Sequence, residues 1–223
     1  MFIQYGYEIT ILCLQPTPII TRLDVHPEVA GRSVETIPFN TSSNTTVEEF
    51  RDDYGNRARR LVAPPGPLTL SAQGIISDDG LLDFAPTNLA EIAVQNLSPE
   101  VLPFLLASRY CDTDLLSERA WTLFGNVQPG GPRVQAICDY VHDRVRFDYA
   151  QARSTRTASE ANAEQVGVCR DYAHLAIAFC RCLNIPARYV NGYLGDIGVP
   201  FNPSPMDFSA WFEAYIEIGR AHV

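Results

Sequence analysis

Long apolar runs are absent from this chain of 223 residues. A membrane-spanning helix needs about 18 or more consecutive apolar residues, and no segment of the sequence reaches that length. The N-terminal stretch also lacks the basic region that opens a secretory signal peptide, and Gln4, Tyr5 and Glu8 interrupt its apolar character. We therefore predict no association with a membrane and a cytoplasmic location.

Positive charge is scarce. The chain has 17 Lys and Arg against 26 Asp and Glu, which gives a formal net charge of -9 and a pI near 4.9. Nucleic acids and anionic membranes select proteins with a basic face. The composition therefore predicts no nucleic-acid partner.

Patterns that bind metals or form disulfides are missing as well. The six cysteines contain no CxxC pair, and none of the four histidines lies at a ligand spacing. Cys180 and Cys182 are two residues apart on a predicted helix, so their side chains point about 200° apart. In a reducing compartment such thiols are most often free and buried. We predict no metal, no cofactor and no disulfide.

Residues 1–84 carry the pattern of a β domain. Tyr7, Ile9, Ile11 and Cys13 alternate with Glu8, Thr10, Leu12 and Leu14, a period of two residues that is typical of a strand. Shorter strand candidates follow, separated by turns rich in Pro and Gly. Regular spacing of this kind predicts a small β-sandwich. The further strand candidates are residues 21–26, 60–62, 68–72 and 74–76, and the turns are residues 54–57 and 64–67.

Helical patterns begin beyond a segment rich in Pro and Asn. Ser98-Pro99-Glu100 has the residues of a helix start, with Pro at the first helical position. A second predicted helix has an apolar face and a solvent face. Its apolar positions are Val134, Ile137, Cys138, Val141 and Val145, and its polar positions are Arg133, Asp139, Asp143 and Arg146.

Residues 169–183 are apolar around nearly their whole circumference, which predicts a buried central helix ended by Asn184 and Pro186. Residues 187–194 and 208–217 then have strand patterns, and Ser209, Trp211 and Glu213 share one face of the second strand. This order of strands, helices and strands predicts an α+β fold. The predicted organisation is a β domain over 1–84, a linker with leading helices over 85–130, and a core over 131–223.

Cys169 is the candidate nucleophile. Gly167 supplies a turn, and the thiol follows at the first turn of the buried helix. The N-terminus of a helix carries partial positive charge, which favours a thiolate, and its backbone N–H groups can bind an oxyanion. On spacing alone, the alternative is one more cysteine of the hydrophobic core.

The motifs around Cys169 resemble those of the bacterial transglutaminase-like superfamily, and the N-terminal region resembles the β domain that often precedes its core. The resemblance implies a papain-like core with a Cys-His-Asp triad, in which Cys169 attacks an amide carbonyl of a protein or peptide substrate. Ser209 occupies the position of the histidine, so we expect residue 209 to lie on the strand face that meets Cys169. The stretches that carry the resemblance are residues 157–161, 167–175, 183–193 and 206–215, with 16–18, 53–56 and 60–64 in the β domain.

None of the four histidines replaces the missing one convincingly. His174 follows Cys169 by five residues and would point about 140° away on a helix, and His142 lies on the amphipathic helix. His26 belongs to the β domain, and His222 lies at the end of the chain. Serine cannot accept a proton near neutral pH.

The strand that would carry the aspartate lies beyond Val223, so we expect the core to be incomplete at its C-terminus. The last six residues have the sequence that one reading frame of a common sequencing adaptor encodes, which suggests an artificial end; a naturally short chain is the alternative.

Two functional interpretations follow. The first is a thiol enzyme that transfers or hydrolyses an acyl group through Cys169. The second is a noncatalytic binding or scaffold member of the same superfamily, favoured by Ser209. The sequence does not distinguish transglutamination, proteolysis and amidase action, and it leaves the oligomeric state open.

Overall fold

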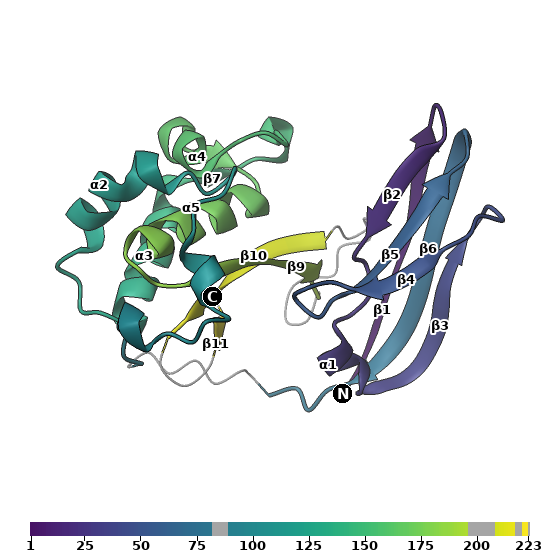
Figure 1. Ribbon diagram of the computed structural model, residues 1–223, viewed down its shortest axis with the longest axis horizontal. Coiled ribbons are helices and arrows are strands. Elements are labelled where there is room, and N and C mark those ends of the chain that lie inside the picture. Colours follow the sequence, from purple (N-terminus) through teal and green to yellow (C-terminus); the bar gives the residue numbers. More distant parts are fainter. Residues whose placement is uncertain (82–88, 196–207, 217–219, 223) are drawn as a thin grey trace. The chain divides into compact units, whose positions relative to one another are not determined.

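The computed structural model describes residues 1–81, 89–195, 208–216 and 220–222. The chain forms two compact units, Met1–Asp83 and Phe84–Val223 (Figure 1). Met206 and Asp207 of the predicted motif, and Ile218, Gly219 and Val223 of the last six residues, lie outside the described residues. No helix in the described part of the chain is long and apolar enough to cross a membrane.

The first unit contains two three-stranded antiparallel sheets, with strand orders β1-β6-β3 and β2-β5-β4. Alternate residues of β1 are sheltered and exposed, as the pattern around Tyr7 predicts. Cys13, Leu61, Ala63, Leu68 and Leu70 form its buried core, to which both sheets contribute. The elements are β1 (Phe2–Cys13), β2 (Thr17–Thr21), α1 (Pro27–Ala30), β3 (Ser33–Thr41), β4 (Glu48–Arg51), β5 (Arg57–Ala63) and β6 (Gly66–Ser77).

One predicted strand of this unit is wrong. Residues 21–26 do not continue as a strand beyond Thr21, because His26 and Pro27 begin the short helix α1. The ring Nδ1 of His26 accepts a hydrogen bond from the backbone N–H of Glu28, 3.4 Å away. Asp24, between these elements, pairs with Arg59 of β5. A polar side chain that caps a helix has therefore overridden the local strand pattern.

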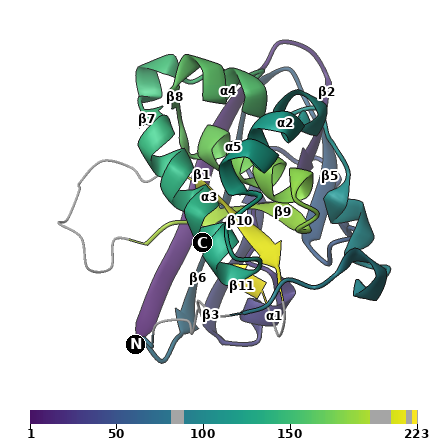
Figure 2. The same ribbon diagram turned by 90° about the vertical axis from the view of Figure 1, so that its left-hand side faces the viewer.

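The second unit is built around the buried helix α5 (Cys169–Cys182), which packs against α2, α3, α4, β9 and β10. Figure 2 shows the helices in front of strands β9 and β10. The sheet has the order β11-β10-β9. The other elements are η1 (Val94–Asn96), η2 (Leu102–Leu105), α2 (Thr113–Phe124), α3 (Gly131–Arg144), β7 (Arg146–Phe147), η3 (Tyr149–Gln151), α4 (Ala158–Glu164), β8 (Val166–Gly167), β9 (Ala187–Tyr193), β10 (Phe208–Tyr215) and β11 (Arg220–His222).

Helix α5 matches the prediction of a central helix without a polar face. Its residues from Ala173 to Cys180 are all buried, and Phe179 and Leu175 are among the largest fully buried side chains. The helix ends before Asn184, which adopts a left-handed conformation with φ of 63°. Phe212 and Ala214 of β10 complete the same core. The buried helix therefore has the sheet on one side and the other helices around it.

Two other predictions for this unit need correction. No α-helix begins at Ser98; residues 98–101 form turns, and the next α-helix, α2, starts at Thr113. Arg133, predicted on the solvent side of α3, is buried. Its guanidinium donates to Glu91 at 2.8 Å and to the carbonyl of Val127 at 3.1 Å. A buried cation needs such partners. The guanidinium of Arg133 therefore forms hydrogen bonds with protein groups in place of water.

Candidate active site

Cys169 is the first residue of α5, and its thiol is free and half-buried. The short strand β8 leads into the helix and pairs in parallel with β7, with Phe147 opposite Gly167. The first backbone N–H groups of an α-helix have no acceptor within the helix, and the aligned peptide dipoles add partial positive charge there. The thiol of Cys169 therefore lies where both an anionic sulfur and a developing oxyanion can be stabilised.

Asp171 stabilises the turn that precedes Cys169. Its carboxylate is fully buried and accepts a hydrogen bond from the backbone N–H of Val168 at 3.0 Å. A Cβ on Gly167 would lie 2.7 Å from the carboxylate oxygen, closer than real contacts allow. Gly167 therefore permits the close approach of Asp171 rather than only a turn. The signal for this role in the sequence is an acidic residue at the third position of a helix, where it caps the N-terminus.

Arg156 neutralises the buried carboxylate of Asp171. The two side chains meet at 2.9 Å, and both are almost completely inaccessible to solvent. The same guanidinium donates to Glu164 at 2.9 Å and to the carbonyl of Gln151 at 2.9 Å. Arg170 adds a second donor to Asp171 at 3.2 Å. The N-terminus of α5 is thus fixed by charge-assisted hydrogen bonds, which are stronger than neutral ones.

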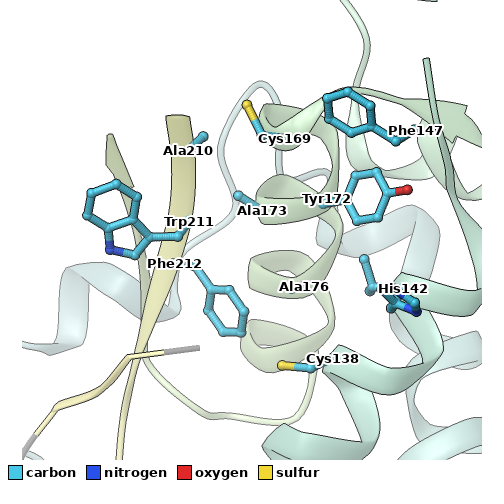
Figure 3. A pocket seen from close by; sticks show the side chains of 11 residues that line it. Cys138, His142, Phe147, Cys169, Tyr172, Ala173, Ala176, Ala210, Trp211 and Phe212 are labelled. Atoms are coloured by element: carbon cyan, nitrogen blue, oxygen red, sulfur yellow. The ribbon is translucent and has the colours of Figure 1, made fainter. Parts of the chain in front are cut away.

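A cavity of about 320 Å³ opens beside Cys169, between α3, α5 and β10. Figure 3 shows the Cys169 sulfur next to Ala210, with the Phe212 ring pointing toward α5. Apart from the two thiols and His142, the lining is mainly aromatic and aliphatic. The lining residues are Cys138, Val141, His142, Phe147, Cys169, Tyr172, Ala173, Ala176, Ala210, Trp211 and Phe212.

Ser209 lies next to the cavity but is not one of its lining residues. It pairs with Gly192, and a Cβ on Gly192 would lie 3.1 Å from the Trp211 ring. Side chains alternate along a strand, so Ser209 shares its face with Trp211, while Ala210 and Phe212 share the opposite one. The expectation that the side chain at 209 meets Cys169 is therefore corrected: position 210 takes that place. That 209 is the superfamily's histidine position stays a prediction.

The structure brings one histidine into the same cavity as Cys169, and this is His142. Its side chain is 85% exposed and pairs with Asp143 through Nδ1 at 3.3 Å. In Figure 3 it lies away from Cys169, with Tyr172 between them. His26 belongs to the first unit, and the side chain of His222 is not described. In the described part of the chain, no imidazole forms a hydrogen bond with the Cys169 thiol.

His174 is buried on the opposite side of α5, as its spacing from Cys169 predicts. Its ring is stacked on Tyr110, with the centroids 5.1 Å apart, and it contacts Tyr189 of β9 at 5.0 Å. Its Nδ1 atom is buried and has no hydrogen-bond partner in the described residues. The pKa of His174 is lowered to about 4, mainly by burial and also by the nearby Arg170, while Asp171 opposes the shift. His174 is therefore uncharged at neutral pH.

The cysteines of the second unit other than Cys169 are held as neutral thiols. Burial raises the pKa of Cys138 to about 12 and that of Cys182 to about 11. Burial also raises the pKa of Cys111 and that of Cys180. A neutral thiol is a poor nucleophile. No cluster of metal-binding side chains occurs among the described residues.

Comparison with known proteins supports the resemblance to this superfamily. Residues 120–221 match the transglutaminase-like superfamily. The fold superposes on the crystal structure of a candidate cysteine protease from Cytophaga hutchinsonii with a TM-score of 0.80. That match has 29% sequence identity and covers 100% of this chain and 78% of the other. The second unit thus has the papain-like fold that the motifs predicted.

The chain also matches two uncharacterized mycobacterial proteins. The one from Mycobacterium tuberculosis is 28% identical over 190 residues, which make up 78% of this chain and 54% of the relative. The one from Mycobacterium leprae is 27% identical over 182 residues, 78% of this chain and 61% of the relative. The chain therefore spans little more than half the length of these relatives.

Proposed function

We propose that this protein is a cysteine-dependent acyltransferase or amide hydrolase with Cys169 as the nucleophile. The observation that carries the proposal is the place of Cys169, at the first residue of a buried helix and at the wall of an apolar cavity. The substrate would be an amide of a protein or peptide. Location in the cytoplasm is part of the same proposal.

The reaction would follow the usual course of thiol acyl transfer. The thiol of Cys169 first loses its proton to solvent. The thiolate sulfur then attacks the carbonyl carbon and forms a C–S bond, and the carbonyl electrons move to oxygen to give a tetrahedral oxyanion. Collapse of this intermediate expels the amine, which takes a proton from solvent, and leaves a thioester. Water or a second amine then releases the acyl group and restores the thiol.

A noncatalytic role is the second candidate, and one observation favours it. No imidazole bonds to the Cys169 thiol in the part of the chain that the structure describes, and Ser209 cannot act as a base. A triad without one member typically loses several orders of magnitude in rate. The fold would then serve to bind a protein or peptide in the cavity without cleaving it.

Replacement of Cys169 by serine tests the proposal. We expect the native protein to modify unfolded casein in the presence of a primary amine probe, and Cys169→Ser to lose at least about 1000-fold in rate. Mass spectrometry of the casein detects chain cleavage, deamidation and amine incorporation in one experiment.

Cys138→Ser is the matched control, since Cys138 lines the same cavity but is a neutral thiol. It should retain the activity of the native protein. Activity that survives in Cys169→Ser would contradict the role of Cys169. Casein left unmodified by the native protein would favour the noncatalytic alternative.

A further inference from the structure

The cavity beside Cys169 continues along the helix that carries the thiol. Cys169, Ala173 and Ala176 line it at positions i, i+4 and i+7 of α5, which fall on one face of an α-helix. A rise of about 1.5 Å per residue places Ala176 roughly 10 Å along the helix from Cys169. Figure 3 shows the thiol at one end of this row and Cys138 of α3 at the other. The cavity therefore starts at the nucleophile and extends about two turns away from it.

The walls of the cavity are buried, whereas one of its edges is exposed. Ala173, Ala176, Val141 and Phe212 are all buried. Phe147 also lines the cavity, at the level of Cys169 in Figure 3, and is 47% exposed. A substrate group can therefore enter next to the nucleophile and reach a part of the cavity that is shielded from water.

The lining offers few polar partners to a bound group. The Tyr172 hydroxyl already donates to the carbonyl of Val145. Burial raises the pKa of Cys138 to about 12, so this thiol is neutral. His142 is exposed to solvent and pairs with Asp143. Burial of a polar or charged group without a hydrogen-bond partner costs free energy, so the cavity selects an apolar group.

We propose that the cavity binds an apolar side chain on the acyl side of the amide, so that the preferred substrate carries a hydrophobic residue at the carbonyl that Cys169 attacks. This inference rests on the proposed function. The volume of about 320 Å³ is sufficient, since a cavity of roughly 150 Å³ already holds benzene. Aromatic rings of the lining favour an aromatic or long aliphatic side chain. These rings belong to Phe147, Tyr172, Trp211 and Phe212.

The test measures how the acyl group affects the rate at which Cys169 is acylated. p-Nitrophenyl 3-phenylpropanoate carries the side chain of phenylalanine, whereas p-nitrophenyl acetate has no side chain to place in the cavity. In both reactions the sulfur forms a thioester and p-nitrophenolate leaves. Each rate is divided by the rate of N-acetylcysteine with the same ester, which removes the intrinsic reactivity of the ester. We expect the phenylpropanoate to react about 10- to 100-fold faster than the acetate on this scale, the gain from burying a phenylalanine side chain. Cys169→Ser gives the background.

Ala176→Leu should remove this preference, because the larger side chain fills the cavity two turns away from the thiol. We expect the preference for the phenylpropanoate to fall by at least about tenfold. The rate with the acetate should stay within about twofold, which also shows that the variant is folded. Ala163→Leu is the matched control, since it makes the same substitution at an exposed position of α4. The comparison of the two esters in the native protein tests the proposal without any variant.

Equal relative rates of the two esters in the native protein would overturn the proposal and leave the proposed function intact. An equal loss with both esters in Ala176→Leu would also overturn it, because the cavity would then serve the leaving group or the fold alone. If neither ester acylates the native protein in a reaction that depends on Cys169, the proposed function fails together with this inference.

Discussion

Replacement of Arg156 by methionine is expected to lower the free energy of unfolding of the second unit by about 3–5 kcal/mol. Methionine fills much of the volume but leaves the carboxylate of Asp171 buried without its main counter-charge. The loss is large because removing one partner of a buried pair leaves an uncompensated charge in a medium that solvates it poorly. The hydrogen bonds to Glu164 and Gln151 are lost as well.

Denaturant unfolding followed by tryptophan fluorescence measures this effect, since both tryptophans, Trp121 and Trp211, belong to the second unit. Arg153→Met is the matched control. Arg153 also pairs with Glu164, but its side chain is 42% exposed, and such pairs contribute about 0–1 kcal/mol. Equal destabilisation by the two variants would contradict the role of Arg156.

Stability of the second unit should fall as the pH is lowered from 7 to 5, because of His174. Its folded-state pKa of about 4 lies below the ordinary value of 6.5, mainly because the ring is buried. The unfolded chain therefore binds the proton first, and stability that is complete above about pH 6.5 is lost as the pH falls toward 4. This shift corresponds to about 2 kcal/mol between pH 7 and pH 5.

His174→Phe should remove this part of the pH dependence, since phenylalanine keeps an aromatic ring between Tyr110 and Tyr189 but does not titrate. His142→Gln is the control, because the His142 side chain is 85% exposed. The measurement is the free energy of unfolding at pH 7 and pH 5 for the three proteins. An unchanged difference between the two pH values in His174→Phe would show that His174 is not the group responsible.

The central helix and the position of Cys169 at its first turn could be predicted from the sequence because their signals are local. Residues from Ala173 to Cys180 are apolar on every side except at His174, and only a helix surrounded by other elements can bury such a surface. Gly167 and Cys169 precede this run directly, so the start of the helix and the place of the thiol follow from it. The alternation along β10 likewise separates its two faces, and the structure shows that Phe212 and Ala214 are on the face that joins the core.

The buried ion pairs of the second unit could not be predicted in the same way, because the two residues of each pair are distant in the sequence. Arg156 precedes Asp171 by 15 residues, and nothing in the local pattern pairs them. By its place in the helical period, Arg133 belongs to the solvent face of α3. In the structure it pairs with Glu91, which lies 42 residues earlier in the sequence. Long-range ion pairs of this kind depend on how the elements pack, which periodicity does not report.

The sequence also did not predict which face of β10 lines the cavity. The motif resemblance assigns position 209 to a histidine that would face Cys169, but it does not determine the direction of the side chain in this chain. That direction depends on the pairing of Ser209 with Gly192 and on the Trp211 ring that covers this glycine.

The most direct test of the account is to locate the acyl group after the native protein has reacted with one equivalent of p-nitrophenyl acetate. Peptide mapping by mass spectrometry assigns the acetyl group to one of the six cysteines. The account predicts that it is found on Cys169, since the other thiols of the second unit are held neutral by burial. Acetyl spread evenly over the cysteines, or concentrated on Cys138 within the same cavity, would contradict the assignment of Cys169 as the nucleophile.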